Sequence, residues 1–204
     1  MSTVVADISM SLDGYVTGPE PGEDSGLGQG GEAIQGWVFN AKDSPRDRQF
    51  LDEASSGTGA VIMGRNTFDF VDGPNGWNAE VSYGYDQGPP ELPPVFVVTH
   101  AAPEDPRHAF TFITDGLEPA VTAAQKAAGD KDVMIMGGAA VIDQALVAGL
   151  VDQLRIHLSP VLMGGGTQLF DLIDERILLR QDDVVVTGHA THLTYRIRED
   201  SWAS

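Results

Sequence analysis

The chain of 204 residues contains no cysteine, very few lysines and no uninterrupted hydrophobic run long enough to cross a membrane. The lack of cysteine excludes disulfides, thiolate zinc sites and a cysteine nucleophile. The lack of a long hydrophobic run predicts no membrane span, and the first residues have neither the basic flank nor the cleavage site of a signal peptide. Together these absences favour a cytoplasmic protein that does not bind membranes.

Positive charge is also scarce, because 12 basic residues stand against 30 acidic ones and give a net charge of −18. This balance argues against nucleic-acid binding, which needs a positive surface. A soluble acidic surface is the simplest interpretation, and adaptation to high salt is the alternative. Any anionic ligand must be held by local donors and helix N-termini, since the overall field repels it.

Short hydrophobic runs bounded by turn residues predict the strands. Several runs, such as Val61-Ile62-Met63, are hydrophobic at every position, which is typical of parallel strands buried on both faces. The predicted strands are Val4–Ile8, Ala60–Met63, Val95–Val98, Phe110–Ile113, Val133–Met136, Leu154–Leu162 and Val184–Ile197.

Helical patterns fall between these strands, over Ser44–Ser55, Leu117–Ala128 and Ala139–Ala148. The alternation of strands and helices predicts an α/β fold with a mostly parallel sheet. The two C-terminal segments alternate polar and apolar residues, which indicates an antiparallel pair at one edge. No linker or charge run divides the chain, so residues 1–204 are expected to form one domain.

Two long segments, Gly18–Gly31 and Gly73–Pro94, are rich in glycine, proline and acids and are expected to be irregular. The first contains Gly26-Leu27-Gly28-Gln29-Gly30-Gly31, which fits the G-x-G-x-x-G pattern. That pattern binds a dinucleotide only when it follows a strand directly and opens a helix. Because this one lies inside an acidic loop, we interpret it as a glycine loop.

A stronger signal is Gly64-Arg65-Asn66-Thr67, which ends a hydrophobic strand and begins a short helix. Backbone amides at a helix start bind phosphate, Thr67 adds a hydroxyl, and the Arg65 guanidinium suits a phosphate monoester. The alternative is an arginine that pairs on the surface. The end of a parallel strand is where α/β sheets bind ligands, which favours the phosphate site.

Two further strand ends carry groups of the same kind. Thr99 and His100 follow one strand, and Gly137-Gly138-Ala139-Ala140 joins another to a helix. Consecutive glycines allow the backbone to approach a pyrophosphate closely, although they also suit tight packing of a helix on a strand. The three strand ends together predict a nucleotide site more specifically than any one of them.

In this order the motifs resemble the dihydrofolate-reductase-like superfamily. The resemblance is carried by SLDG at Ser11–Gly14, GRNTF at Gly64–Phe68, VTH at Val98–His100, GGA at Gly137–Ala139 and the segment Leu150–Phe170. More closely, the chain is similar to stand-alone proteins related to the riboflavin-pathway pyrimidine reductase domain. The resemblance covers nearly the whole chain and implies a three-layer dihydrofolate-reductase-like fold.

The resemblance also implies NADPH as the cofactor. Arg65 would lie near the 2′-phosphate and Thr67 near the other phosphates, with Thr99 and His100 at the same end. A cis peptide is expected between the glycines of the pyrophosphate segment. The first strand and the loop after it would face the nicotinamide. The cofactor-binding candidates are Ala6, Gly64, Arg65, Thr67, Thr99, His100, Gly137, Gly138, Ala139 and Ala140.

Asp47 is the candidate catalytic acid, because related reductases carry an acid on the first helix. It would share a helical face with Phe50, and it would polarise or protonate the substrate. An acid that favours the helix dipole is an equal alternative. Candidate substrate residues are Ile8, Asp13, Trp37, Phe39 and Phe50, although Asp13 also suits a turn and the aromatic residues also suit the core.

His189 and His192 have a metal-like spacing, but a strand would direct them to opposite faces, so no metal is expected. The absence of cysteine also excludes, within these residues, the zinc deaminase often fused to the riboflavin enzyme. Three functions remain open. The first is an NADPH-dependent reductase of a flat heterocycle such as a dihydropterin. The others are a 5-amino-6-(5-phosphoribosylamino)uracil reductase and a non-catalytic nucleotide-binding protein. The C-terminal strands are expected to support a homodimer.

Overall fold

The computed structural model describes residues 2–78, 82–83 and 92–197, so the expected irregular segment Gly73–Pro94 lies partly outside the described residues. The strands are β1 (Val4–Ser11), β2 (Thr58–Gly64), β3 (Val95–Val98), β4 (Thr111–Ile113), β5 (Asp132–Ile135), β6 (Gln153–Ser159), β7 (Leu179–Val186) and β8 (Thr191–Ile197). The helices are α1 (Gly36–Phe39), α2 (Pro45–Gly57), α3 (Arg65–Asp72), α4 (Leu117–Ala128) and α5 (Ala139–Val147), with 3-10 turns at Gly31–Ala33 and Ala41–Asp43.

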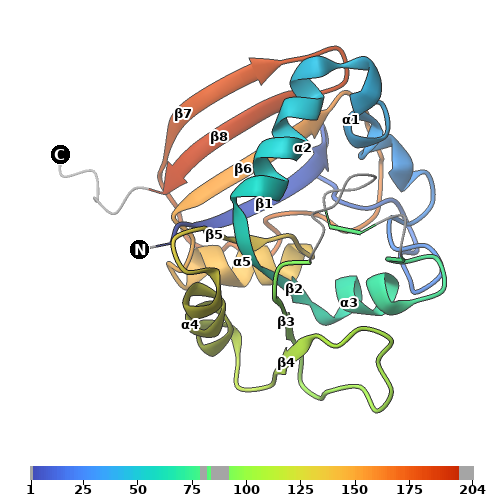
Figure 1. The fold of residues 1–204 in the computed structure, drawn as a ribbon. Coiled ribbons are helices and arrows are strands. Elements are labelled where there is room, and N and C mark those ends of the chain that lie inside the picture. Colours follow the sequence, from blue (N-terminus) through green and yellow to red (C-terminus); the bar gives the residue numbers. More distant parts are fainter. Residues whose placement is uncertain (1, 79–81, 84–91, 198–204) are drawn as a thin grey trace.

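These eight strands form one sheet in the order β4-β3-β2-β5-β1-β6-β8-β7. Every neighbouring pair from β4 to β6 is parallel, whereas β8 is antiparallel to both β6 and β7. Helices cover both faces, with α2 crossing in front of β6 and β1 and α5 lying behind the sheet (Figure 1). The mostly parallel, three-layer architecture with antiparallel C-terminal strands is confirmed.

Two hydrophobic clusters fill the spaces between the layers. On one face, α4 and α5 pack through small side chains such as Ala124 and Ala145 against Ala6 and Ile62 of the sheet. On the other face, Phe68 of α3 packs with a second cluster. The continuous hydrophobic runs form strands with both faces covered, as their composition predicts.

The expected single strand Val184–Ile197 is wrong, because the structure divides this segment into β7 and β8. The turn between them is held by Thr187, whose hydroxyl accepts hydrogen bonds from the amides of His189 and Ala190. The preceding strand β7 begins at Leu179, in a polar stretch that hydrophobic runs do not reveal. The antiparallel partner of β6 is therefore β8, and β7 adds an edge strand beyond it.

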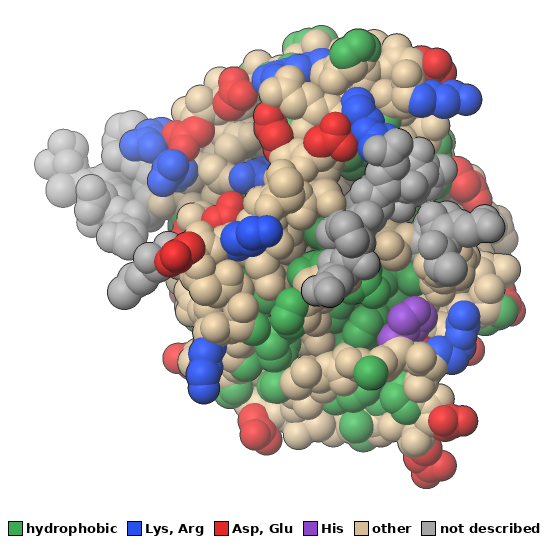
Figure 2. All heavy atoms as spheres, viewed as in Figure 1, with side chains coloured by type: hydrophobic (Ala, Val, Ile, Leu, Met, Phe, Trp, Pro, Cys, Tyr) green, Lys and Arg blue, Asp and Glu red, His purple; other side chains and the backbone are tan. Residues whose placement is uncertain are grey.

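The edge strand β7 exposes large hydrophobic side chains, with Val184 40% and Val186 74% exposed. The homodimer expected from the C-terminal strands stays a prediction. Acidic side chains are spread over the visible face of the molecule rather than gathered in one patch (Figure 2). Among the described residues, no helix is long and apolar enough to cross a membrane.

Asp143 on α5 holds the loop before β7, and it generates a prediction about stability. Its buried carboxylate accepts hydrogen bonds from the amides of Phe170 (3.0 Å) and Leu172 (3.1 Å). Asp143→Ala removes both acceptors, so we expect it to lower the free energy of unfolding by about 1–3 kcal/mol in urea denaturation. Val147→Ala, on an exposed position of the same helix, is the control. Equal losses for the two variants would contradict this role of Asp143.

Candidate active site

Three neighbouring strands end together at one rim of the sheet. In the parallel register, Gly64 at the end of β2 lies beside Val98 of β3, and Ile62 lies beside Ile135 at the end of β5. The turns that follow are in contact, because the amide of Gly64 donates to the carbonyl of Gly137 over 2.8 Å. The convergence of turns expected from three separate motifs is therefore present.

Two helices start at this rim, each after a glycine. Gly64 precedes α3 and Gly138 precedes α5, and neither helix start is capped by a side-chain hydrogen bond. The peptide between Gly137 and Gly138 is cis, as the resemblance implies. A Cβ atom built on Gly138 would lie 3.5 Å from the hydroxyl of Thr67, so this hydroxyl faces the glycine pair. Amides and a hydroxyl around an open backbone are suited to phosphate oxygens.

Arg65 and Thr99 meet at the side of the same rim. The Arg65 guanidinium donates to the carbonyl of Ala101 (3.2 Å), and the Thr99 hydroxyl donates to the same carbonyl (2.9 Å). Arg65 also forms an ion pair with Asp69 one helical turn later, at 2.6 Å. The Arg65 side chain is 43% exposed, so it is accessible to an anion that competes with Asp69.

The remaining cofactor candidates differ in their surroundings. His100 is exposed beside Thr99, and Ala140 is exposed at the start of α5, whereas Ala139 is buried. Ala6 is fully buried in the core between the sheet and α5, so its side chain does not reach this rim. Ile8, two residues further along β1, lies 3.7 Å from a Cβ built on Gly137.

A cavity of about 160 Å³ continues from this rim. Ile8 and Met136 line it on the rim side. Its other lining residues are Asp7, Ser9, Gln35, Trp37, Phe50, Leu51, Ala54, Ser55, Tyr83, Met134 and His157. A second cavity of about 230 Å³ shares Asp7, Phe50 and His157 with the first, so the two form adjoining parts of one hollow under α2.

The aromatic candidates have different positions. Trp37 on α1 is buried, lines the first cavity and donates from its indole nitrogen to the hydroxyl of Ser9 over 2.8 Å. Phe50 lines both cavities and stacks on His192, with ring centroids 4.2 Å apart. Phe39 is 40% exposed and lies outside the cavity lining.

The sheet under α2 has a polar face. Residues on alternate positions of neighbouring strands point to this side, and the register pairs Asp7 with Arg155 and Ser9 with His157. Residue His157 in turn lies opposite His192 of β8. Leu154, Ile156 and Leu193 point to the opposite, hydrophobic side. Alternation here separates a buried polar face from the core.

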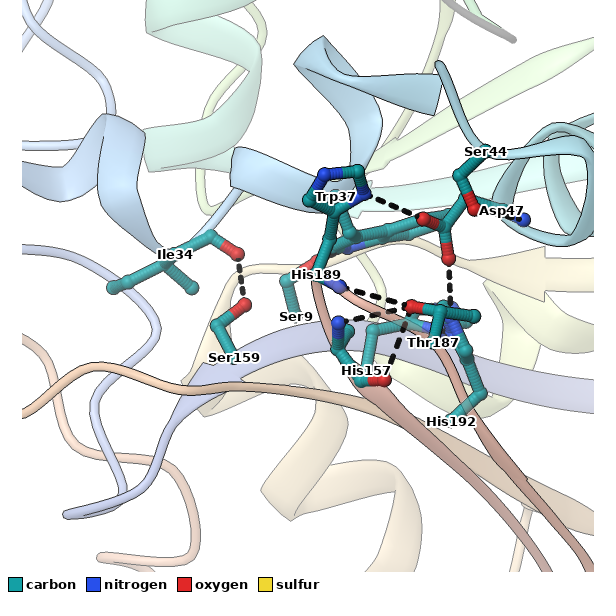
Figure 3. Close-up of polar contacts among 11 residues, drawn as sticks. Ser9, Ile34, Trp37, Ser44, Asp47, His157, Ser159, Thr187, His189 and His192 are labelled. Carbon is teal, nitrogen blue, oxygen red and sulfur yellow. Dashed lines mark hydrogen bonds and ion pairs between the residues drawn. The ribbon is translucent and has the colours of Figure 1, made fainter. Parts of the chain in front are cut away.

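Asp47 of α2 is fully buried above this polar face. Its carboxylate contacts His189 Nδ1 and His192 Nε2, each at 2.9 Å (Figure 3). The expectation that His189 and His192 lie on opposite sides is wrong. His189 lies in the turn before β8, outside the regular strand, so both imidazoles reach the same carboxylate.

The contacts continue from His192 toward the cavity. Its Nδ1 lies 2.7 Å from Nδ1 of His157, and Nε2 of His157 lies 3.0 Å from the Asp7 carboxylate. We call Asp7, His157, His192 and Asp47 the imidazole–carboxylate chain. The sequence interpretation missed Asp7, His157 and the role of His192. The signal that could have found them is the alternation of polar residues in β1, β6 and β8.

Burial and hydrogen bonding act in opposite directions on the two carboxyl groups. For Asp7, burial favours the neutral form, but the nearby His157, Arg155 and His192 together outweigh burial and lower the pKa. For Asp47, burial is likewise outweighed by hydrogen bonds, first from His189, and the pKa is lowered. Burial and the neighbouring His157 lower the pKa of His192. Among the described residues, no group of three possible ligands is placed to hold a metal ion.

Asp13 lies outside the cavity lining and joins two loops. Its carboxylate accepts hydrogen bonds from the Ser11 hydroxyl (2.6 Å) and from the amides of Met163 (3.0 Å) and Gly164 (2.8 Å). These bonds, led by the one from Ser11, lower the pKa of Asp13 to about 2. The geometry supports the turn interpretation of Asp13 over contact with substrate.

Comparison with known proteins agrees with this architecture. A putative riboflavin biosynthesis protein from Shewanella sp. PV-4 superposes with a TM-score of 0.69 at 23% identity, over 98% of this chain and 100% of that one. Dihydrofolate reductase from Enterococcus faecalis, solved with NADP(H) and RAB-propyl, superposes with a TM-score of 0.59 at 17% identity, over 97% of each chain. These likenesses define a dihydrofolate-reductase-like fold.

Within that fold, the chain belongs to the RibD C-terminal domain family, whose model matches residues 2–193. One curated relative is the uncharacterized protein YyaP of Bacillus subtilis (strain 168), which is 38% identical over 69 residues. That match covers 34% of this chain and 36% of YyaP, so it spans about a third of the relative's length. The resemblance expected from the motifs is confirmed.

The Asp13 anchor predicts a loss of stability in acid. The pKa of Asp13 is lower in the folded than in the unfolded chain, so its contribution is complete above about pH 4 and is lost as the pH falls toward 2. Urea denaturation between pH 5 and pH 2.5 should therefore show a smaller fall in unfolding free energy for Asp13→Asn than for the unchanged protein. Asp115→Asn, at an exposed position before α4, should retain the full fall. Identical pH dependence in both variants would refute the anchor.

Proposed function

We propose that the protein is an NADPH-dependent reductase that transfers hydride to a small flat heterocycle of the dihydropterin or dihydrofolate kind. One observation carries the proposal. The rim formed by Gly64, Thr67 and the cis Gly137–Gly138 peptide adjoins, through Ile8 and Met136, the cavity lined by aromatic and polar side chains. A cofactor bound along the rim would meet a substrate in the cavity.

The residues at the rim have the chemistry that NADPH needs. Uncapped starts of α3 and α5 and the Thr67 hydroxyl suit the pyrophosphate, and the Arg65 guanidinium suits the 2′-phosphate. These local donors act against the field of a chain with a net charge of −18. When bound, the cofactor supplies the hydride. Membership of the RibD C-terminal domain family, and the NADP(H) present in the dihydrofolate reductase structure, support this choice of cofactor.

The cavity residues bind and orient the substrate. Trp37 is fixed by its bond to Ser9, and Phe50 is fixed by stacking on His192, so both present rigid aromatic surfaces to a planar ring. Gln35, which accepts from Ser9 and lines the same cavity, adds a polar group for ring nitrogens or carbonyls. Walls of this kind hold the reacting carbon in place and exclude water.

A second candidate is the reduction of a ribosylaminopyrimidine phosphate, as in riboflavin synthesis. Family membership favours it, and so do two cations, Arg46 and Arg155, in the lining of the second cavity. The same lining contains Glu53, Asp132 and Asp183, which oppose an anionic phosphate. Because these acids outnumber the two arginines, the lining favours an uncharged or cationic ring over a phosphorylated substrate.

The two candidates are separated by following NADPH oxidation with dihydrofolate and with 5-amino-6-(5-phosphoribosylamino)uracil. We expect turnover with the pterin and little with the phosphorylated pyrimidine. The reverse preference would establish the second candidate. Tight NADPH binding without turnover on any pterin or pyrimidine would instead indicate a non-catalytic nucleotide-binding protein and overturn the proposal.

Arg65→Ala should affect the binding of NADPH and the binding of NADH differently. Losing a charge-assisted contact to the 2′-phosphate should weaken NADPH binding about ten- to a hundredfold and leave NADH binding nearly unchanged, as measured by fluorescence titration. Arg180→Ala is a matched control, because Arg180 lies on β7 at the far edge of the sheet and is 62% exposed. Equal weakening of NADPH and NADH would exclude the 2′-phosphate role.

A further inference from the structure

The imidazole–carboxylate chain is a continuous line of hydrogen-bonding groups that begins in the protein interior and ends at the cavity. Asp47 is fully buried, His192 is 2% exposed and His157 is 6% exposed. Asp7, at the other end, is 19% exposed and lines both cavities. Four groups from α2, β8, β6 and β1 thus connect a buried acid to the place expected for the substrate.

The number of protons in this line follows from its geometry. Its three contacts, from Asp7 to His157, from His157 to His192 and from His192 to Asp47, measure 3.0, 2.7 and 2.9 Å. Each needs one proton, because two lone pairs at such a distance repel each other. Two neutral imidazoles supply only two protons. If both point their N–H groups at the carboxylates, the contact between the two Nδ1 atoms has none.

The structure therefore assigns a third proton to the imidazole–carboxylate chain, and we propose that Asp7 delivers this proton to the substrate. The inference rests on the proposed reductase function and names its proton donor. Asp7 is the catalytic acid of this proposal, because it lines the cavity. His157, His192 and Asp47 are positioning residues that hold the proton and direct it toward Asp7. This replaces direct proton donation by Asp47, whose carboxylate is fully buried.

The excess proton can occupy any group of the line without breaking a contact. Moving one proton within each hydrogen bond converts a neutral Asp47 and an ionised Asp7 into an ionised Asp47 and a neutral Asp7. The lowered pKa values of both carboxyl groups disfavour Asp7 and Asp47 as the resting position of the proton. A proton on Nε2 of His157 is one hydrogen bond away from Asp7, at 3.0 Å.

Charged side chains from several neighbouring elements surround the imidazole–carboxylate chain. His189, from the turn before β8, contacts Asp47, and its side chain is 33% exposed. The charged groups that line the second cavity near Asp7 and His157 are Arg46 and Glu53 of α2, Asp132 of β5, Arg155 of β6 and Asp183 of β7. The acids among them favour a retained proton, whereas the two arginines oppose it.

The chemical step balances with one cofactor and one proton. The carbon of a C=N or C=O bond accepts the hydride, the π electron pair moves to the nitrogen or oxygen, and this atom takes the proton from Asp7. The product is CH–NH or CH–OH, and NADPH, when bound, would supply the two electrons of the hydride. Asp7 receives its proton from Nε2 of His157 during the step. After product release, Asp7 can take a new proton from water in the open cavity.

The proton itself can be observed without cofactor or substrate. In the ¹⁵N-labelled full-length protein at pH 7, we expect a far-downfield proton resonance that is coupled to an imidazole Nδ1. The resonance should disappear in His192→Gln and persist in His108→Gln. His108 forms a comparable pair with Asp72 (2.8 Å), outside the residues that line the two cavities. If both Nδ1 atoms of the unchanged protein are unprotonated at pH 7, the proposal is overturned.

Activity as a function of pH provides the second test. Asp7→Asn should lower kcat about a hundredfold or more and leave NADPH affinity unchanged. Asp47→Asn removes an anion 2.9 Å from His192, so the pH above which kcat falls should decrease by about one unit or more. His108→Gln should keep the unchanged protein's profile. Full activity of Asp7→Asn, or an unshifted profile of Asp47→Asn with its fold intact, would each refute the proposal.

Failure of the proposed reductase function and failure of the proposed proton source give different experimental results. If the bridging proton is present but NADPH does not bind, the reductase function fails while the proton count stands. If NADPH is oxidised with substrate but the bridging resonance is absent, the function stands and this proton source is excluded. The resonance is measured in the unchanged protein, so the test does not depend on whether a variant folds.

Discussion

The candidate site depends on the parallel register between β1 and β6. This register pairs Asp7 with Arg155 and Ser9 with His157, and it places their side chains on the face that α2 covers. A shift by one residue would send these polar groups into the hydrophobic cluster against α5 and turn Leu154 and Ile156 toward α2. The register is therefore held by the burial of one face, and the polar site on the other face follows from it.

Much of this architecture could be predicted from the sequence, because local signals there agreed with the fold. Strands with continuous hydrophobic runs, such as Val95–Val98, and the helix Leu117–Ala128 have the predicted bounds. The three motifs that we predict to bind phosphate lie at strand ends that the topology brings together, which explains why separate local patterns indicated one rim. The cis peptide between Gly137 and Gly138 followed only from the family resemblance.

The polar half of the site could not be predicted, because alternation of polar and apolar residues along a strand can have two physical causes. Polar residues on every second position of a strand usually face water. Here they face a hollow under α2 and satisfy one another, so a buried His157 and a solvated one have the same sequence pattern. Only the position of α2 distinguishes them. The position of the same helix also buries Asp47. Its carboxylate contacts His189 and His192, which lie more than a hundred positions later in the sequence.

The ion pair between Arg65 and Asp69 has a consequence for how an anion would enter the rim. Because the guanidinium already has a partner one helical turn away, an incoming phosphate must exchange with a carboxylate rather than fill an empty position. The exchange leaves Asp69 uncompensated beside the new anion, which weakens retention and favours rapid release. Dissolved salt screens that repulsion along with the long-range field of the acidic surface. Residence at the rim therefore depends on ionic strength through both the attraction to Arg65 and the repulsion from Asp69.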